Sequence, residues 1–457
     1  MKNNTHYTKR PLIYSSELLE PQVERVYPID YISRENVSQL SNRTYFLQTR
    51  EIESIKRIAP YTERSRGSWE DIDFTRLRQE KNNLLKNLRN KFSKSHKKQL
   101  ALLLPGHNEE LIIATTIKSA LAGGQDKKDI YVVDDNSSDN TRAEAVKLLG
   151  EANVLSVERS GKALAVKKAL NHFDIVNRYE WLHVADADSV FCPDYFRIYK
   201  EKLDSKKYSV ALGFVQSLRG NWISDYRAAT YTYSQHVNRR IQSKLGMISV
   251  FPGPITSFRT DIIDDLDFES NTLTEDFDIT LQVHRKKLGK ILFIPKAVNY
   301  TQDPQTLKDF IKQNQRWQRG FFQGVKKYNI GKSLKAIDLS LSFQVWQAVF
   351  YLFQLFVLLP MVIILTGEWM YLAVFLAADF VIASVATIIS SIVIKRWSVI
   401  GSLPYFYFLR WVEIAVFVAS FVEIYWLKKF RGESRGWSTK GRRYKLNSMA
   451  LKDTAKG

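Results

Sequence analysis

Hydrophobic and polar positions follow different patterns in successive parts of the chain. Residues 1–72 are polar throughout, which predicts a polar N-terminal extension without a signal peptide and a cytoplasmic location for the domain after it. Over residues 73–98, apolar residues recur at helical spacing among Lys and Arg residues, which predicts a basic amphipathic helix. Such a helix suits an anionic membrane surface, and it suits equally well a packed position with a solvated basic face.

Residues 99–330 alternate between short apolar runs and helical spacing. The helical spacing predicts a helix over Glu110–Leu121. The apolar runs predict strands at Gln99–Leu104, Ile130–Val133, Trp181–Ala185, Tyr208–Phe214 and Lys290–Ile294. This alternation indicates a mostly parallel α/β sheet, and ligands of such sheets bind beyond the carboxyl ends of the strands.

Three long apolar stretches occupy residues 331–427, at about Phe343–Leu365, Met370–Ile394 and Ile400–Leu427. Each is near or above the roughly 20 residues that cross a bilayer as a helix, so we predict an α-helical membrane region with two to three helices. The third stretch also contains Pro404 and charged residues, and it either spans the membrane, lies in its interface or re-enters.

The tail at residues 428–457 carries ten basic and two acidic residues. The positive-inside rule places such a tail in the cytoplasm, whereas three spans after a cytoplasmic front would place it outside. Two spans with one interfacial or re-entrant segment satisfy both requirements.

Composition narrows the function classes. A net charge of +20, from 67 Lys and Arg against 47 Asp and Glu residues, suggests a polyanionic partner such as nucleic acid, nucleotide phosphates or an anionic membrane face. Because the excess flanks the apolar segments and forms no free basic domain, we expect no nucleic-acid partner. One cysteine, Cys192, excludes a disulfide framework and a cysteine-based zinc site.

Polar clusters follow the predicted strands. Pro105–Glu110 follows the first and Asp134–Thr141 the second, and each taken singly is also typical of an ordinary turn. Next comes Arg159–Ala163, in which Lys162 offers a point charge to a phosphate without matching a Walker motif.

Two further clusters supply carboxylates and a cation. Asp186 and Asp188, two residues apart after a buried strand, suit Mg²⁺ or Mn²⁺ bridging the phosphates of a nucleotide. An acid in Thr274–Asp276 is a candidate general base. In Gln313–Trp317, Arg316 offers a planar charge and Trp317 a stacking face, although Trp317 equally suits a membrane-interface anchor.

In this order the motifs resemble those of the processive inverting family 2 glycosyltransferases, such as the synthases of hyaluronan, chitin, cellulose and poly-N-acetylglucosamine. The resemblance covers about residues 99–330 and rests on Asp134–Ser137, Gly161–Ala163, Asp186–Asp188, Thr274–Asp276 and Gln313-x-x-Arg316-Trp317. It implies a GT-A-like nucleotide-sugar transferase fold followed by the membrane helices. It also implies a multi-pass protein of the plasma membrane with a cytoplasmic catalytic domain.

The resemblance also assigns roles to residues. Nucleotide-sugar contacts fall to Pro105, Asn108, Glu109, Asp134, Asp135, Lys162 and Asp186. Asp186 and Asp188 hold the metal, Mg²⁺ or Mn²⁺, and Asp276, with Glu275 beside it, is the catalytic base. Gln313, Arg316 and Trp317 bind the diphosphate and the acceptor. The segment Gly253–Arg259 stands where the family has an acceptor-facing loop.

The expected reaction is transfer from a UDP-sugar, UDP-GlcNAc or UDP-Glc in the first place, to the hydroxyl end of a growing β-linked polysaccharide. The few spans imply that a second copy or an accessory membrane subunit completes a pore, or that the product is short or lipid-linked. Two alternatives stay open: transfer of a single sugar to a polyprenyl phosphate or lipid, and a basic nucleic-acid-binding or membrane-scaffold protein with a decayed transferase domain, which the position of the positive charge does not favour.

Overall fold

The computed structural model describes residues 97–268 and 272–429, which belong to one compact unit. The predicted extension at 1–72, nearly all of the predicted basic helix and most of the tail lie outside the described residues. Lys98, the last residue of that predicted helix, is instead the first residue of a strand.

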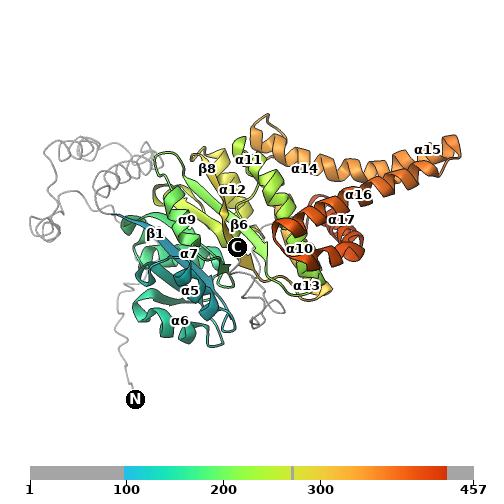
Figure 1. Cartoon of the computed structure of the whole chain (residues 1–457). Helices are drawn as coiled ribbons and strands as arrows, with labels where there is room; N and C mark the ends of the chain where they lie inside the picture. The colour runs from blue at the N-terminus through green and yellow to red at the C-terminus, as the bar shows by residue number, and fades with distance from the viewer. Residues whose placement is uncertain (1–96, 269–271, 430–457) are drawn as a thin grey trace, which may run out of the picture. The chain divides into compact units, whose positions relative to one another are not determined.

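An eight-stranded sheet forms the centre of the described unit (Figure 1). Its strands are Lys98–Gly106 (β1), Ile130–Asp135 (β2), Val154–Val157 (β3), Tyr179–Val184 (β4), Val190–Phe191 (β5), Val210–Ser217 (β6), Thr256–Arg259 (β7) and Ile291–Thr301 (β8). The order across the sheet is β3-β2-β1-β4-β7-β6-β8-β5. The pairs β1–β2, β1–β4, β2–β3 and β6–β8 are parallel, and β7 runs antiparallel between β4 and β6.

The five predicted strands are confirmed as β1, β2, β4, β6 and β8, and the sheet is mostly parallel as predicted. Three strands escaped prediction: β3 has four residues and β5 has two, which are short apolar runs, and β7 has the sequence Thr-Ser-Phe-Arg. The last requires a correction, because the segment Gly253–Arg259 is not all loop. Its residues Thr256–Arg259 form a strand inside the sheet, and Gly253 and Pro254 at its start line the cavity described below.

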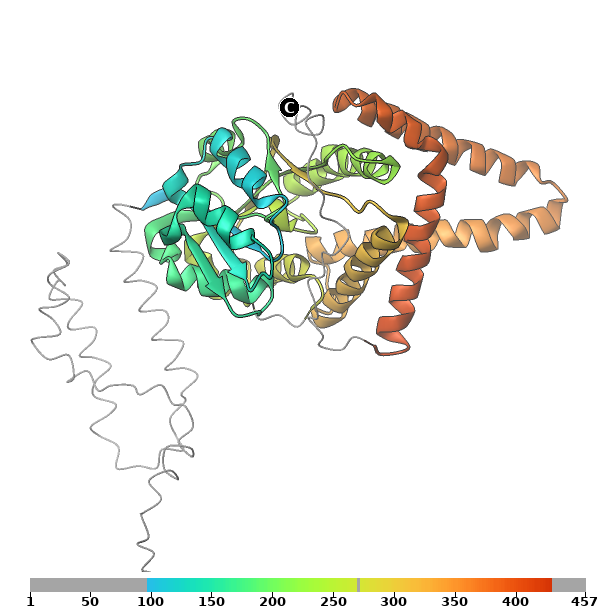
Figure 2. The same cartoon turned by 90° about the horizontal axis from the view of Figure 1, so that it is seen from below.

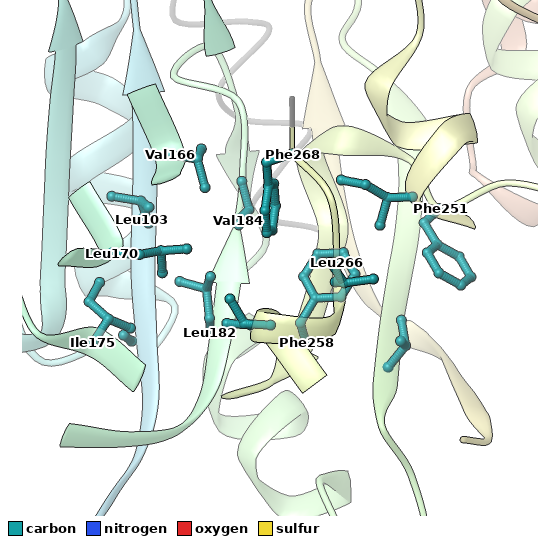
Figure 3. Close-up of a cluster of buried hydrophobic side chains, with 14 of the residues drawn as sticks. Leu103, Val166, Leu170, Ile175, Leu182, Val184, Phe251, Phe258, Leu266 and Phe268 are labelled. Atoms are coloured by element: carbon teal, nitrogen blue, oxygen red, sulfur yellow. The ribbon is translucent and has the colours of Figure 1, made fainter. Parts of the chain in front are cut away.

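Helices cover both faces of the sheet. The shorter ones are Ile113–Ala122 (α5), Thr141–Leu149 (α6), Lys162–His172 (α7), Ile175–Arg178 (α8), Tyr195–Lys202 (α9), Trp222–Tyr233 (α10), Arg240–Lys244 (α11) and Glu275–Arg285 (α12). Apolar residues of α7, α8 and α12 pack on one face of the sheet (Figure 3), and those of α5, α6 and α9 pack on the other. The predicted helix at Glu110–Leu121 is confirmed as α5, which begins three residues later.

Long helices come after the sheet: Leu307–Lys327 (α13), Ala336–Phe353 (α14), Leu359–Thr366 (α15), Met370–Val393 (α16) and Leu403–Tyr425 (α17). A π-helical turn, Gln354–Leu358, joins α14 to α15 in one rod. Figures 1 and 2 show that this rod and α16 form a hairpin directed away from the sheet. Three segments of the described chain, Ala336–Thr366, Met370–Val393 and Trp397–Tyr425, are long and apolar enough to cross a membrane.

Helix α17 packs along α13 rather than along the hairpin alone. Leu409 of α17 packs with Phe310 near the start of α13, and Glu423 forms a bidentate ion pair with Arg319. Phe322 contacts the aromatic rings of α17 from Phe417 to Tyr425. Most of the length of α17 is therefore held against a helix of the sheet domain.

Two glycines allow α13 to lie directly on the start of α12. A Cβ atom at Gly320 would lie 2.2 Å from Thr274 Oγ1, and one at Gly324 would lie 2.6 Å from Phe277 Cε1. Only a residue without a side chain permits this approach. The close packing brings α13 to the end of α12 where two carboxylates lie, Glu275 and Asp276.

We expect Gly324→Ala to lower stability by about 1–3 kcal/mol, because the new methyl group must displace the ring of Phe277. The measurement is the melting temperature in detergent. Gly401→Ala is the matched control, since a Cβ atom at Gly401 meets nothing within 4 Å. Equal melting temperatures for the two variants would contradict the close-packing argument.

Candidate functional site

Four charged side chains meet beyond the carboxyl end of β4. Asp186 follows that strand, Lys162 opens α7, and Glu275 and Asp276 open α12. The Nζ atom of Lys162 lies 2.5 Å from Asp186 Oδ1 and 3.7 Å from Glu275 Oε1. Gly253 makes room for this contact, because a Cβ atom there would lie 2.7 Å from the same Nζ atom.

The electrostatics of this cluster keep Lys162 charged. Burial alone would lower the pKa of its ammonium group, but the charges of Asp186 and Glu275 outweigh burial and raise the pKa well above its usual value. A permanently charged lysine at the carboxyl ends of the strands offers a counter-charge to phosphate groups.

Asp276 has the properties of a general base. Burial, and then the negative charge of Glu275, raise the pKa of its carboxyl group to about 6, while Arg316 and Lys162 act in the opposite direction. A carboxylate with a pKa in this range is ionised at neutral pH and accepts a proton more readily than an ordinary aspartate.

These residues line a cavity of about 580 Å³. The cavity brings together, from several separate motifs, Lys162, Asp186, Asp188, Glu275, Asp276, Gln313, Arg316 and Trp317. The start of the segment predicted as an acceptor-facing loop also lines it, through Gly253 and Pro254. The cavity continues to the long apolar helices, where Leu341, Val345 and Ala348 of α14 and Phe417 of α17 form part of its wall.

The motif Gln313-x-x-Arg316-Trp317 on α13 is held by a residue of α10 that the sequence pattern did not reveal. Arg227 of α10 is 4% exposed, its guanidinium lies 4.6 Å from the ring centroid of Trp317, and its Nη2 atom donates to Gln313 Oε1 at 3.2 Å. Arg227 therefore holds two of the three motif side chains in place. A buried arginine in an unremarked stretch of helix gives no signal in a single sequence.

The other predicted nucleotide-binding residues lie at the ends of β1 and β2, outside the lining of this cavity. Pro105 lies in β1 and pairs in register with Val133. Asn108 has a left-handed backbone with φ of 58°, its N–H donates to Ser137 Oγ, and its side chain accepts from the Ser138 N–H. The N–H of Glu109, which is fully buried, donates to Thr141 Oγ1.

The two aspartates at the end of β2 bind groups of neighbouring loops. Asp135 accepts hydrogen bonds from the N–H groups of Ser160 and Gly161, at 2.7 and 2.9 Å. Asp134 accepts from the N–H of Ser137 and from the hydroxyl of Ser156. Asp135 thereby fixes the loop directly before Lys162. These hydrogen bonds connect the end of β2 to the charged cluster.

Asp186 and Asp188 suit a divalent cation as two oxygen donors two residues apart at one cavity. Within residues 97–268 and 272–429, no group of three or more His, Cys, Asp or Glu side chains forms a metal cage. Two carboxylates are a sufficient protein donor set for Mg²⁺ when substrate phosphates and water complete the coordination.

Parts of the chain are similar to known proteins. Residues 181–418 match the sequence model of glycosyl transferase family group 2, which covers just over half of the chain. Poly-beta-1,6-N-acetyl-D-glucosamine synthase of Staphylococcus aureus (strain COL) is 27% identical over 228 residues, covering 48% of this chain and 54% of the relative. The probable glycosyltransferase YdaM of Bacillus subtilis (strain 168) is 28% identical over 240 residues, 49% of this chain and 55% of the relative.

The chain thus spans about half the length of the curated relatives that it matches. Among solved structures, the mannosyltransferase PcManGT from Pyrobaculum calidifontis, in complex with GDP-Man and Mn²⁺, aligns with a TM-score of 0.44 and 16% identity, covering 73% of this chain and 89% of that one. The fold is the GT-A-like glycosyltransferase fold, followed by apolar helices that could span a membrane. With its family match over residues 181–418, the chain belongs to glycosyl transferase family group 2.

Proposed function

We propose that the protein is a membrane-embedded, inverting glycosyltransferase that transfers sugar from a UDP-sugar to the hydroxyl end of a β-linked polysaccharide. The observation that carries this proposal is the convergence of Lys162, Asp186, Asp276 and Arg316 on one cavity that also reaches the apolar helices. The likeness to a poly-N-acetylglucosamine synthase supports a UDP-GlcNAc donor, and UDP-Glc is the other favoured donor.

In the proposed reaction, Asp276 takes the proton from the acceptor hydroxyl. The hydroxyl oxygen then forms a bond to the anomeric carbon as the bond from that carbon to the diphosphate oxygen breaks, and UDP leaves. Lys162 and Arg316 stabilise the negative charge that develops on the diphosphate. Attack from the face opposite UDP converts an α-linked donor into a β-linked product.

The donor site extends from the cavity to the end of β2. Asp134 or Asp135 contacts the uracil, with Pro105, Asn108 and Glu109 beside it. Asp186 and Asp188 hold Mg²⁺ or Mn²⁺, and a bound cation would neutralise the diphosphate as a leaving group. Gln313 and Trp317, which Arg227 holds in place, bind the acceptor end.

Transfer of a single sugar to a polyprenyl phosphate or another lipid is the second candidate function. The apolar wall that α14 and α17 contribute to the cavity favours it. Incubation of the purified protein with radiolabelled UDP-sugars and sizing of the product separates the two functions, because a polymer and a singly glycosylated lipid differ greatly in size.

The arrangement of α17 suggests how the chain sits at the membrane. Helix α13 cannot enter the hydrocarbon core, because it carries seven charged residues: Lys308, Asp309, Lys312, Arg316, Arg319, Lys326 and Lys327. Because α17 packs along α13, it shares the depth of that helix. We infer that the α14–α16 hairpin enters a plasma membrane while α17 lies at the cytoplasmic surface, which keeps the basic tail with the catalytic domain.

The base assignment is tested by Asp276→Asn. We expect a fall in kcat of about 10²- to 10⁴-fold, because the amide cannot accept the hydroxyl proton, while UDP binding persists. UDP release from UDP-GlcNAc and UDP-Glc with Mg²⁺ or Mn²⁺ measures the effect. Glu201→Gln, on the exposed surface of α9, is the control. Undiminished turnover in Asp276→Asn would assign the base to another group.

The pH dependence tests the same carboxylate. Since its pKa is raised to about 6, Asp276 is protonated and inactive as a base below that pH. We expect kcat/KM to rise about tenfold per pH unit up to about pH 6 and then to level off. Glu275→Gln removes a charge that raises this pKa, so the inflection should move to lower pH; an inflection that stays in place would argue against the assignment.

The position of α17 is tested by cysteine labelling with a membrane-impermeant maleimide on sealed vesicles. Cys192, the chain's one cysteine, is 1% exposed and leaves a low background. We expect Lys428→Cys, at the end of α17, to react from the same side as Lys127→Cys in the catalytic domain. Reaction together with Glu368→Cys, at the tip of the hairpin, would show that α17 crosses the membrane.

A further inference from the structure

A buried arginine that is not part of the charged cluster lines the same cavity. Arg239 lies at the end of a π-helical segment, Ser234–Arg239, and is 8% exposed. Among the residues that the structure describes, its guanidinium makes a single hydrogen bond, a long one of 3.5 Å to Gln235 Oε1, and no ion pair. The Gln235 side chain is already committed to the backbone of Val215, at 3.0 and 2.6 Å.

The electrostatics separate Arg239 from the charged cluster that performs the proposed reaction. Burial lowers the pKa of its guanidinium to about 10, and no carboxylate in the described part of the chain counteracts the effect. Lys162, by contrast, is surrounded by carboxylates, and Arg316 acts on Asp276. Asp186 and Asp276 therefore do not provide the counter-charge of Arg239, although all of them line one cavity.

An uncompensated buried charge is costly, and a ligand anion removes that cost. A guanidinium offers paired N–H donors that match a phosphate or carboxylate, which makes phosphate and carboxylate the natural ligands. The hydroxyl or amide groups of Ser234, Ser249 and Gln344 also line the cavity and can complete the coordination of such an anion.

The remaining wall indicates what the anion is attached to. Leu341, Val345 and Ala348 come from α14, and this helix begins the hairpin that is apolar enough to cross a membrane. Phe417 comes from α17. An anion site within a cavity whose wall belongs to membrane-facing helices fits an amphiphile, with its charged group at Arg239 and its hydrocarbon along α14.

We propose that Arg239 forms a second, anion-binding subsite of the cavity, which takes the phosphate group of a lipid acceptor. This inference rests on the proposed function in its second form, transfer of a single sugar to a lipid, and names the residue that binds the phosphate of that acceptor. Arg239 binds and orients the phosphate of the acceptor, an ionised oxygen of that phosphate forms the bond to the anomeric carbon as UDP leaves, and Lys162 stabilises the departing diphosphate. Free phosphate shares the charged group of this ligand and lacks its hydrocarbon.

The test measures binding of farnesyl phosphate, farnesol and inorganic phosphate to the full-length protein in detergent. We expect Arg239→Gln to weaken farnesyl phosphate binding roughly ten- to hundredfold, the loss of one or two charged hydrogen bonds. Farnesol should bind weakly to every variant. Arg239→Lys, which keeps the charge but loses the paired donors, should fall between the wild type and Arg239→Gln. Arg240→Gln is the matched control, because Arg240 is the next residue and is exposed.

Each contrary result has a distinct meaning. Equal affinity of the wild type and Arg239→Gln for farnesyl phosphate would overturn the proposal, and equal affinity of the wild type for inorganic and farnesyl phosphate would overturn the lipid assignment. Stronger binding of a glucuronate oligosaccharide would replace the lipid with an acidic polymer. UDP binding, measured on the same samples, reports folding and the donor site, so its absence in the wild type would count against the proposed function instead.

Discussion

The structure depends on the cost of placing charge inside a folded protein. Two carboxylates, Asp186 and Glu275, come together beyond the sheet, and their mutual repulsion is tolerable because the ammonium group of Lys162 lies 2.5 and 3.7 Å from them. The residues that position Lys162 therefore also stabilise this pair of carboxylates. Asp135 holds the loop before α7, and Gly253 leaves room for the Nζ atom.

The same constraint extends to the long helices. Arg285 at the end of α12 forms a bidentate ion pair with Asp338 at the start of α14, and Arg319 does the same with Glu423 of α17. The helix that carries Asp276 is therefore joined at its far end to the hairpin. A displacement of the apolar helices would reach the carboxylate cluster through these paired charges.

The sequence predicted much of this arrangement because its signals are local. Apolar runs that end at polar turns identified β1, β2, β4, β6 and β8, and apolar stretches long enough to cross a bilayer identified the helices after α13. The motif residues could be found from their types and order, and the cavity unites those from Lys162 to Trp317. The strand β7 was missed, since it is held by its neighbours β4 and β6 rather than by its own composition.

By itself, the sequence determined the alternation of strands and helices, the apolar stretches and the residue types available for chemistry, because these depend on spacing along one chain. Only the tertiary structure decided which charges meet. It placed Arg227 beneath Trp317, left Arg239 without an ionic partner among the described residues and laid α17 along α13. These outcomes depend on side chains far apart in sequence, and a charge acquires its pKa and its partners only when folding removes it from water.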